Sequence, residues 1–362
     1  MRKKIRRCCS RLCSKRNTAF ILAIILAGIS LCGCTSPLPR EEETPTEIRI
    51  GVCMHNSYEA FVWSIGDQMV QWCREKEKET GIKFTIDVIS SKGSQLTQND
   101  QVEKYIAKDY DVLCINLVDR TDPTVIIERA MDADVPIIFF NRELVEEDLN
   151  RWDQLFYVGA EAEQAGILQA SIITDALSDP ERFDEIDVNH NGTIQYVMLE
   201  GEPGHQDALI RTRVCTEKLQ EARISIEKLA DENANWDRDQ AKTKMNALIN
   251  RLPFQIEMVI ANDDVMALGA LDALEEANYP IKPLVVGVNG DEEALEAIHA
   301  GKMGGSVYND ATGKANTIME MAYALAMHED FPDDIHLRNG KYVFLPYRRI
   351  TNDNVFDYME SK

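Results

Sequence analysis

Short apolar runs alternate with longer amphipathic stretches along most of the chain. The runs are four to seven residues long, begin with IRIGVCM at 48–54, and are almost continuously hydrophobic. Continuous hydrophobicity is typical of strands that are buried on both faces of a parallel sheet, whereas strands with one wet face alternate. The stretches between the runs have the length and spacing of crossover helices. We therefore predict an α/β fold built on parallel sheets.

The predicted elements form two series. The first has strands at 48–54, 83–89, 111–117 and 136–141, with helices at 61–78, 98–108 and 124–133. The second has strands at 193–200, 224–230, 257–261, 283–289 and 304–309, with helices at 207–222, 237–252, 263–277 and 291–300. Each series spans about 110 to 150 residues, enough for a core of its own, so we predict two Rossmann-like lobes.

Residues 1–33 have the pattern of a signal peptide. A basic stretch, Arg2 to Arg16, precedes an apolar run from Ala19 to Leu31, and Cys34 follows shortly after. The run is shorter than the roughly 20 residues that span a bilayer. It resembles a bacterial lipoprotein signal, which implies that Cys34 becomes the lipidated first residue of the mature protein. An uncleaved N-terminal anchor is the alternative. Residues 34–47, rich in Pro and Glu, are expected to form an extended tether.

Charge and cysteine usage narrow the function classes. The chain has 362 residues and a net charge of −22, and the eight basic residues of the signal leave −30 for the remainder. So acidic a surface repels phosphate backbones, which excludes nucleic acid as the main partner. Four cysteines remain beyond Cys34, two of them inside apolar runs, and we expect free buried thiols rather than disulfides. They are Cys53, Cys73, Cys114 and Cys215.

Polar and aromatic residues recur just beyond the carboxyl ends of the predicted strands. Open α/β sheets bind ligands at this edge, and two such edges facing each other form a cleft. Amides, carboxylates and a guanidinium offer paired hydrogen bonds to adjacent hydroxyls, and aromatic faces cover the C–H surface of a sugar ring. The set therefore predicts a monosaccharide site. Its members are Glu59, Phe61, Asn141, His205, Asp207, Arg211, Trp236, Asp263, Asn289 and Asn309.

Single members of this set have simpler interpretations. Asp207 and Arg211 stand four apart at a helix start, which also fits a cap and a surface ion pair. Phe61 and Trp236 also fit a hydrophobic core. Their shared position at strand ends favours the binding site, and the absence of a nucleophile paired with a base from the set favours binding over catalysis.

Longer motifs carry a family resemblance. DVNHNGTIQYVMLEGEPGHQDALIRT and IEMVIANDDVMALGALDAL resemble the bacterial galactose/glucose-binding proteins of methylgalactoside ABC transport systems, which are periplasmic binding proteins of type 1. The resemblance implies two lobes that close on one aldohexose and a three-strand hinge with crossings near Tyr157, Asn309 and Pro346. It implies an N-terminal lobe of residues 48–156 with 310–345, and a C-terminal lobe of residues 157–309 with 346–362.

The resemblance also implies roles for the candidate residues. Phe61 and Trp236 match the ring-stacking pair, and five positions match hydrogen-bonding residues, namely Asn141, His205, Asp207, Arg211 and Asn309. Three positions depart from the family pattern: Glu59 replaces an Asp, Asp263 replaces an Asn, and Asn289 replaces an Asp. These departures bear on which hexose is preferred rather than on sugar binding itself.

A second segment has the spacing of a calcium loop. Oxygen-bearing residues occupy its positions 1, 3, 5, 7 and 9, with Gly192 at the tight turn. These residues are Asp187, Asn189, Asn191, Thr193 through its carbonyl, and Gln195. Position 12 is Met198, so the bidentate Glu has to come from elsewhere, and the resemblance implies Glu257. We expect structural Ca²⁺ here, with an Asx-rich turn as the alternative.

Taken together, these patterns predict a lipid-anchored, monomeric protein on the outer face of the cell membrane. It would deliver glucose or galactose to the permease of an ABC transporter and catalyse no reaction. The alternatives are a sugar sensor docking on a membrane kinase or chemoreceptor, a binder of a related monosaccharide, and a metal-assisted sugar hydrolase using Asp207 and Glu59. A LacI-type repressor would share the fold, but here an export signal stands where its DNA-binding helices would be.

Overall fold

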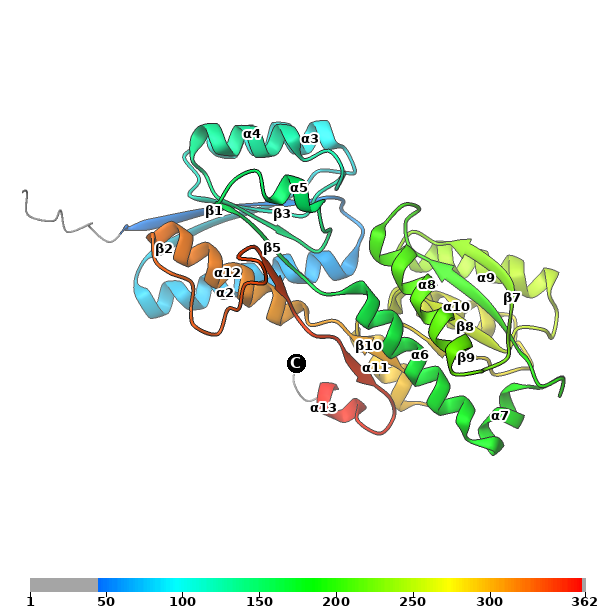
Figure 1. The fold of residues 1–362 in the computed structure, drawn as a ribbon. Coiled ribbons are helices and arrows are strands. Elements are labelled where there is room, and N and C mark those ends of the chain that lie inside the picture. Colours follow the sequence, from blue (N-terminus) through cyan, green and yellow to red (C-terminus); the bar gives the residue numbers. More distant parts are fainter. Residues whose placement is uncertain (1–44, 360–362) are drawn as a thin grey trace, which may run out of the picture. The chain divides into compact units, whose positions relative to one another are not determined.

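The computed structural model describes residues 45–359, whose helices and strands are labelled in Figure 1. The predicted signal peptide, Cys34 and most of the predicted tether lie outside the described residues. The tether is shorter than predicted, because Glu47 already pairs with Lys83 at the start of β1 (Glu47–Met54). None of the helices in the described range combines the length and apolarity that crossing a membrane requires.

The first lobe is a six-stranded sheet with the order β11-β5-β4-β3-β1-β2, and every neighbouring pair is parallel. Besides β1, its strands are β2 (Lys83–Ser90), β3 (Val112–Ile115), β4 (Ile137–Phe140), β5 (Leu155–Gly159) and β11 (Tyr342–Phe344). Helices α2 (Ala60–Thr80) and α12 (Ala311–Met327) cover one face, and α3 (Gln95–Ile106) and α4 (Thr124–Ala133) cover the other (Figure 1). A short helix, α5 (Glu146–Leu149), precedes β5. Strands β3, β4 and β5 are buried along their whole length, as their unbroken hydrophobicity predicts.

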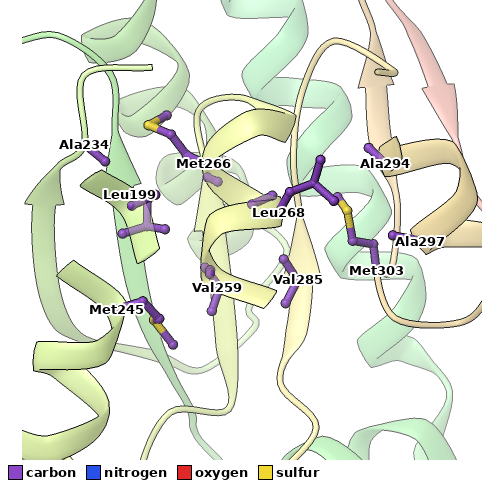
Figure 2. Packing of buried hydrophobic residues seen from close by; sticks show 14 of the residues in the cluster. Leu199, Ala234, Met245, Val259, Met266, Leu268, Val285, Ala294, Ala297 and Met303 are labelled. Atoms are coloured by element: carbon purple, nitrogen blue, oxygen red, sulfur yellow. The ribbon is translucent and has the colours of Figure 1, made fainter. Parts of the chain in front are cut away.

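The second lobe has a four-stranded parallel sheet with the order β7-β6-β8-β9. Its strands are β6 (Ile194–Glu200), β7 (Ile226–Asn233), β8 (Met258–Ala261) and β9 (Leu284–Val286). Helices α6 (Ala162–Ser178) and α8 (Gln206–Glu221) pack together, as do α9 (Arg238–Arg251) and α10 (Asp264–Glu276). The shorter helices are α7 (Pro180–Ile186), α11 (Glu292–His299) and α13 (Val355–Met359). Figure 2 shows Leu199, Val259 and Val285 of the sheet meeting methionines on one face of this lobe.

The two lobes confirm the predicted α/β architecture, but the last predicted strand behaves differently. Residues 306–308 form β10, which pairs antiparallel with β12 (Arg348–Ile350) as a separate two-stranded ribbon. Only isolated bridges, such as Asn289 to Tyr308, connect it to the end of β9. The prediction of one more parallel sheet strand here was therefore wrong, because a distant segment supplies the partner.

The chain passes between the lobes three times, between β5 and α6, between β10 and α12, and between β11 and β12. Strand β5 continues to Gly159, so the predicted lobe boundary at 156/157 falls inside a strand. Tyr347 lies in the third passage and is buried. The four cysteines of the described residues are free and buried.

Candidate functional site

The ten candidate residues line one cavity between the two lobes. Phe61 and Glu59 follow β1 and Asn141 follows β4, while the other seven follow strands of the second lobe and β10. The cavity offers only about 20 Å³ to water, room for a molecule or two, so a larger ligand would enter only when the lobes or their side chains move apart. Next to it lies a cavity of about 260 Å³, which shares His205 and Asp207. The two cavities therefore share part of one wall.

Three of the lining residues have a backbone conformation that side chains rarely adopt. The φ angles are 63° at Asn141, 60° at Trp236 and 123° at Asn289. Positive φ costs free energy at residues other than glycine, most of all at a bulky one such as Trp, and it persists where the surrounding structure imposes it. Such strain is concentrated at ligand sites, and here it aims three side chains at one cavity.

The Trp236 ring is held by a close approach to the backbone. A Cβ at Gly201 would lie 2.0 Å from the ring, so only glycine fits there. His205 meets the ring edge-on at a centroid distance of 5.2 Å, and the Arg211 guanidinium lies 6.0 Å above it. Trp236 is therefore fixed on three sides.

His205 is a neutral hydrogen-bond donor. It caps α8, and its Nδ1 accepts from the backbone N–H of Asp207 at 3.2 Å. Burial lowers its pKa to about 4, so the imidazole is neutral near pH 7. Because Nδ1 accepts, the proton is on Nε2, which is buried and has no hydrogen-bond partner in the part of the chain that the structure describes.

Arg211 is anchored at one end and open at the other. Its Nη1 donates to the Asn262 carbonyl at 3.0 Å, and its Nη2 donates to the Tyr347 hydroxyl at 2.9 Å and to Asp207 at 3.4 Å. Its Nε is buried without a partner within residues 45–359, as is Nε1 of Trp236. A buried N–H left unpaired costs about 1–3 kcal/mol, so these donors favour a ligand rich in oxygen.

The carboxylates of Glu59 and Asp263 are in different electrostatic states. Burial alone would raise the pKa of Glu59, but the hydrogen bond from His55 and nearby positive charges lower it to about 2. Glu59 Oε2 lies 3.0 Å from His55 Nε2. Burial raises the pKa of Asp263 well above its ordinary value, although its carboxylate accepts from the Met266 N–H at 2.8 Å as the cap of α10. Glu59 is thus an ionised acceptor, while burial favours the protonated form of Asp263.

Three residues at the site were missed by the sequence analysis. His55 faces Glu59 with one ring nitrogen and the Asn116 side-chain oxygen with the other. Arg142 is buried and forms an ion pair with Glu202 of the other lobe. Lys314 is buried against Asn309. The sequence contained a signal for two of these residues. Arg142 directly follows the candidate residue Asn141, and Lys314 lies in the first turn of α12, where the helix dipole disfavours a cation.

The residues of the candidate calcium loop converge in the structure. Asn189 Nδ2 lies 2.5 Å from Gln195 Oε1 and 3.1 Å from Glu257 Oε1. The other Glu257 oxygen accepts from the Gln195 N–H at 2.9 Å, and Asp187 accepts from two backbone N–H groups of the loop. Neutral oxygens and two carboxylates fit Ca²⁺, which prefers oxygen ligands. The described residues contain no group of three His, Cys, Asp or Glu able to hold a metal, so amide oxygens would have to complete this site.

Comparison with known proteins identifies the family. A family model described as periplasmic binding protein domain matches residues 50–330. The D-galactose/methyl-galactoside binding periplasmic protein of Haemophilus influenzae is 31% identical over 315 residues, covering 86% of this chain and 92% of that protein. The ribose import binding protein of Bacillus subtilis is 26% identical, over 81% of this chain and 87% of that protein.

A solved structure shares the same fold. The ABC transporter solute binding protein from Bacillus halodurans, determined with bound myo-inositol, superimposes with a TM-score of 0.72 and 27% identity, covering 89% of this chain and all of that one. A solute binding protein from Actinobacillus succinogenes with bound D-allose has a TM-score of 0.71 at 22% identity and supports the fold alone.

Proposed function

The chain belongs to the periplasmic binding protein family, and from this membership we propose that it binds one aldohexose, glucose or galactose, and delivers it to an ABC transporter. Membership implies that the folded part lies outside the cytoplasmic membrane, and several of the relatives it matches are named as sugar-binding proteins. In the proposal Cys34 carries the lipid that anchors a monomer to the outer face of the membrane. The function is binding and release, without bond cleavage.

One observation carries the proposal of a sugar ligand. The residues that line the cavity include three with unpaired buried N–H groups, His205, Arg211 and Trp236, and one ionised carboxylate, Glu59. Each sugar hydroxyl can accept one hydrogen bond and donate another, so a ring of hydroxyls satisfies both kinds of group. Phe61 from the first lobe and Trp236 from the second supply apolar surface for the ring.

The choice of glucose or galactose is supported by the 31% identity to the D-galactose/methyl-galactoside binding protein of Haemophilus influenzae and by the residues that the family resemblance implies. Other relatives are named for binding rhizopine, xylitol and ribose. In the proposal, the side chains of Glu59, Asp263 and Asn289 determine which arrangement of sugar hydroxyls the cavity binds. We also propose a structural Ca²⁺ at the loop of Asp187 and Glu257, away from the cavity. Its role would be stability, because none of its ligands lines the sugar cavity.

Isothermal titration of residues 45–362 with a panel of aldohexoses, pentoses and inositols tests the function. We expect glucose or galactose to bind with micromolar or tighter affinity, and sugars that lack one paired hydroxyl to bind far more weakly. Trp236→Ala should weaken binding at least tenfold, since an aromatic contact and a donor are both lost. No heat with any sugar of the panel would refute the proposal. Release of phenol from aryl glycosides would favour the hydrolase instead.

A further inference from the structure

A buried lysine, Lys314, contacts one of the residues that line the cavity. Lys314 is in the first turn of α12, is 2% exposed, and donates from Nζ to Asn309 Oδ1 at 2.5 Å. Asn309 Nδ2 in turn donates to Asn289 Oδ1 at 3.2 Å. Both amides line the sugar cavity, whereas Lys314 itself stands behind them. Lys314, Asn309 and Asn289 therefore form a chain of hydrogen bonds that ends at the cavity, and we refer to it as the amide relay.

We propose that Lys314 sets the donor and acceptor orientation of the Asn309 and Asn289 amides and thereby determines which sugar hydroxyls the site accepts. The inference rests on the sugar binding proposed above, and it concerns a residue that touches the cavity wall rather than the ligand. Lys314 is in this sense a positioning residue for specificity.

The direction of the relay follows from the chemistry of its first member. A lysine ammonium has three donors and no acceptor, so the Asn309 oxygen must face it and the Asn309 NH₂ must face away. The NH₂ meets Asn289, whose oxygen must then accept. Asn289 is left with its own NH₂ for the cavity. Without Lys314, each amide could rotate by 180° at little cost.

The main chain holds the two amides side by side. Asn309 N–H donates to the Asn289 carbonyl at 3.1 Å, and Asn289 N–H donates to the Val307 carbonyl at 2.9 Å. The positive φ of Asn289 further restricts its side chain. The relay therefore has little positional freedom, and orientation is what remains to be fixed.

The surroundings of Lys314 give it no stronger partner. It forms no ion pair among the described residues, and the charged groups near it are Asp207 and Arg211 of α8 and Asp310 at the start of its own helix. Its Nζ lies 5.0 Å from the Phe61 ring and 5.9 Å from the Tyr347 ring. Burial lowers the pKa of Lys314 to about 7. The charge-assisted bond to Asn309 is thus at its strongest below neutral pH.

The relay has a consequence for the ligand class. An ionised Asp at position 289, which the family resemblance implies for relatives, would only accept, whereas the relay makes Asn289 a donor toward the cavity. The hydroxyl that meets Asn289 must therefore accept a hydrogen bond. A deoxysugar without an oxygen at this point, or an epimer whose hydroxyl points elsewhere, would be disfavoured.

The orientation can be tested without any sugar by following the asparagine side-chain NH₂ resonances in ¹⁵N NMR spectra between pH 6 and 9. We expect the NH₂ signals of Asn309 and Asn289 to shift with a midpoint near pH 7, and Lys314→Met to abolish this titration. Because Asp207, Arg211, Asp310 and Tyr347 remain in the variant, the loss would assign the titration to Lys314. Signals that do not move in the native chain, or that move identically in Lys314→Met, would overturn the relay.

A double-mutant cycle tests the effect on specificity. Lys314→Met should weaken the preferred hexose about tenfold, the usual worth of one well-placed hydrogen bond. In an Asn289→Asp background the same change should cost less than threefold, because a carboxylate accepts from Asn309 whether or not Lys314 is present. Lys302→Met, at an exposed lysine paired with Glu275, is the control and should change nothing.

Equal losses from Lys314→Met in the two backgrounds would overturn the inference while leaving the proposed function intact. Absence of sugar binding by the native chain would refute the proposed function, and the pH titration of the amides would still decide whether the relay exists. Circular dichroism of each variant checks that the fold is retained.

Discussion

Sugar release should be accelerated by removing the charge of Glu202. This residue follows β6 in the second lobe and forms an ion pair with Arg142, which follows β4 in the first lobe. The pair therefore exists only while the lobes are together, and its loss weakens the closed state. Glu202→Gln keeps the shape and one acceptor oxygen, so it removes the charge and little else.

The exposure of the two partners sets the size of the effect. The Arg142 side chain is 9% exposed and also donates to the Val118 carbonyl at 3.1 Å, so it is well positioned in advance. The Glu202 side chain is 38% exposed, which allows water to screen the interaction. A pair of this kind is worth about 1 kcal/mol, at the upper end for exposed ion pairs. At 25 °C that corresponds to about fivefold in the dissociation rate.

Stopped-flow tryptophan fluorescence, with the sugar–protein complex mixed against excess competing sugar, measures the dissociation rate directly. We expect a fivefold increase for Glu202→Gln at low salt and a smaller one at high salt, because salt screens the native pair. Asp231→Asn is a matched control, since it breaks a comparable pair, Lys228 with Asp231 at 2.6 Å, within the second lobe. An unchanged dissociation rate in Glu202→Gln, or an equal increase in the control, would refute the reasoning.

Three further changes have defined outcomes. EDTA and Glu257→Ala should each lower the melting temperature in calcium-containing buffer while leaving sugar affinity nearly unchanged, and melting curves indifferent to both would refute the calcium site. Because burial lowers the pKa of His205 to about 4, the stability that the neutral imidazole contributes is complete above pH 6.5 and is lost as the pH falls from 6.5 to 4. Urea titrations should show this loss as an effect of order 3 kcal/mol in the free energy of unfolding, and His205→Asn should abolish it. An identical pH profile in the variant would contradict this assignment. Gly201→Ala should weaken hexose binding at least tenfold in isothermal titration, since its Cβ would displace the Trp236 ring, and native affinity in this variant would show that the ring position is immaterial.

Most of the fold followed from the sequence because long, buried elements carry strong patterns. Helix α4 was predicted with the residues it has in the structure, and β3 and β4 lie within their predicted runs. The elements that were not assigned include the 17-residue helices α6 and α12 and the strand β5, as well as three-residue strands such as β11 and β12. A strand of three residues has no measurable period, and its partner is chosen by tertiary contacts that local sequence does not contain.

The candidate site was predictable to the extent that it lies at strand ends. Ten residues chosen for that position line one cavity in the structure, although their roles as sugar ligands stay a prediction. His55 and Lys314 were missed because they contact Glu59 and Asn309 rather than line the cavity, and the local sequence does not show which way such side chains point. The inclusion of Glu257 with a loop some 60 residues away came only from the family resemblance.

The position of β11 has a consequence for how the protein folds. Residues 342–344 complete the sheet whose first strand is β1, so the edge of β5 has no partner until almost the whole chain is available. A growing or partly translocated chain would therefore expose that edge, where another strand can pair and start aggregation. Trimming the chain before Tyr342 should likewise leave a lobe with an open edge rather than a smaller stable domain.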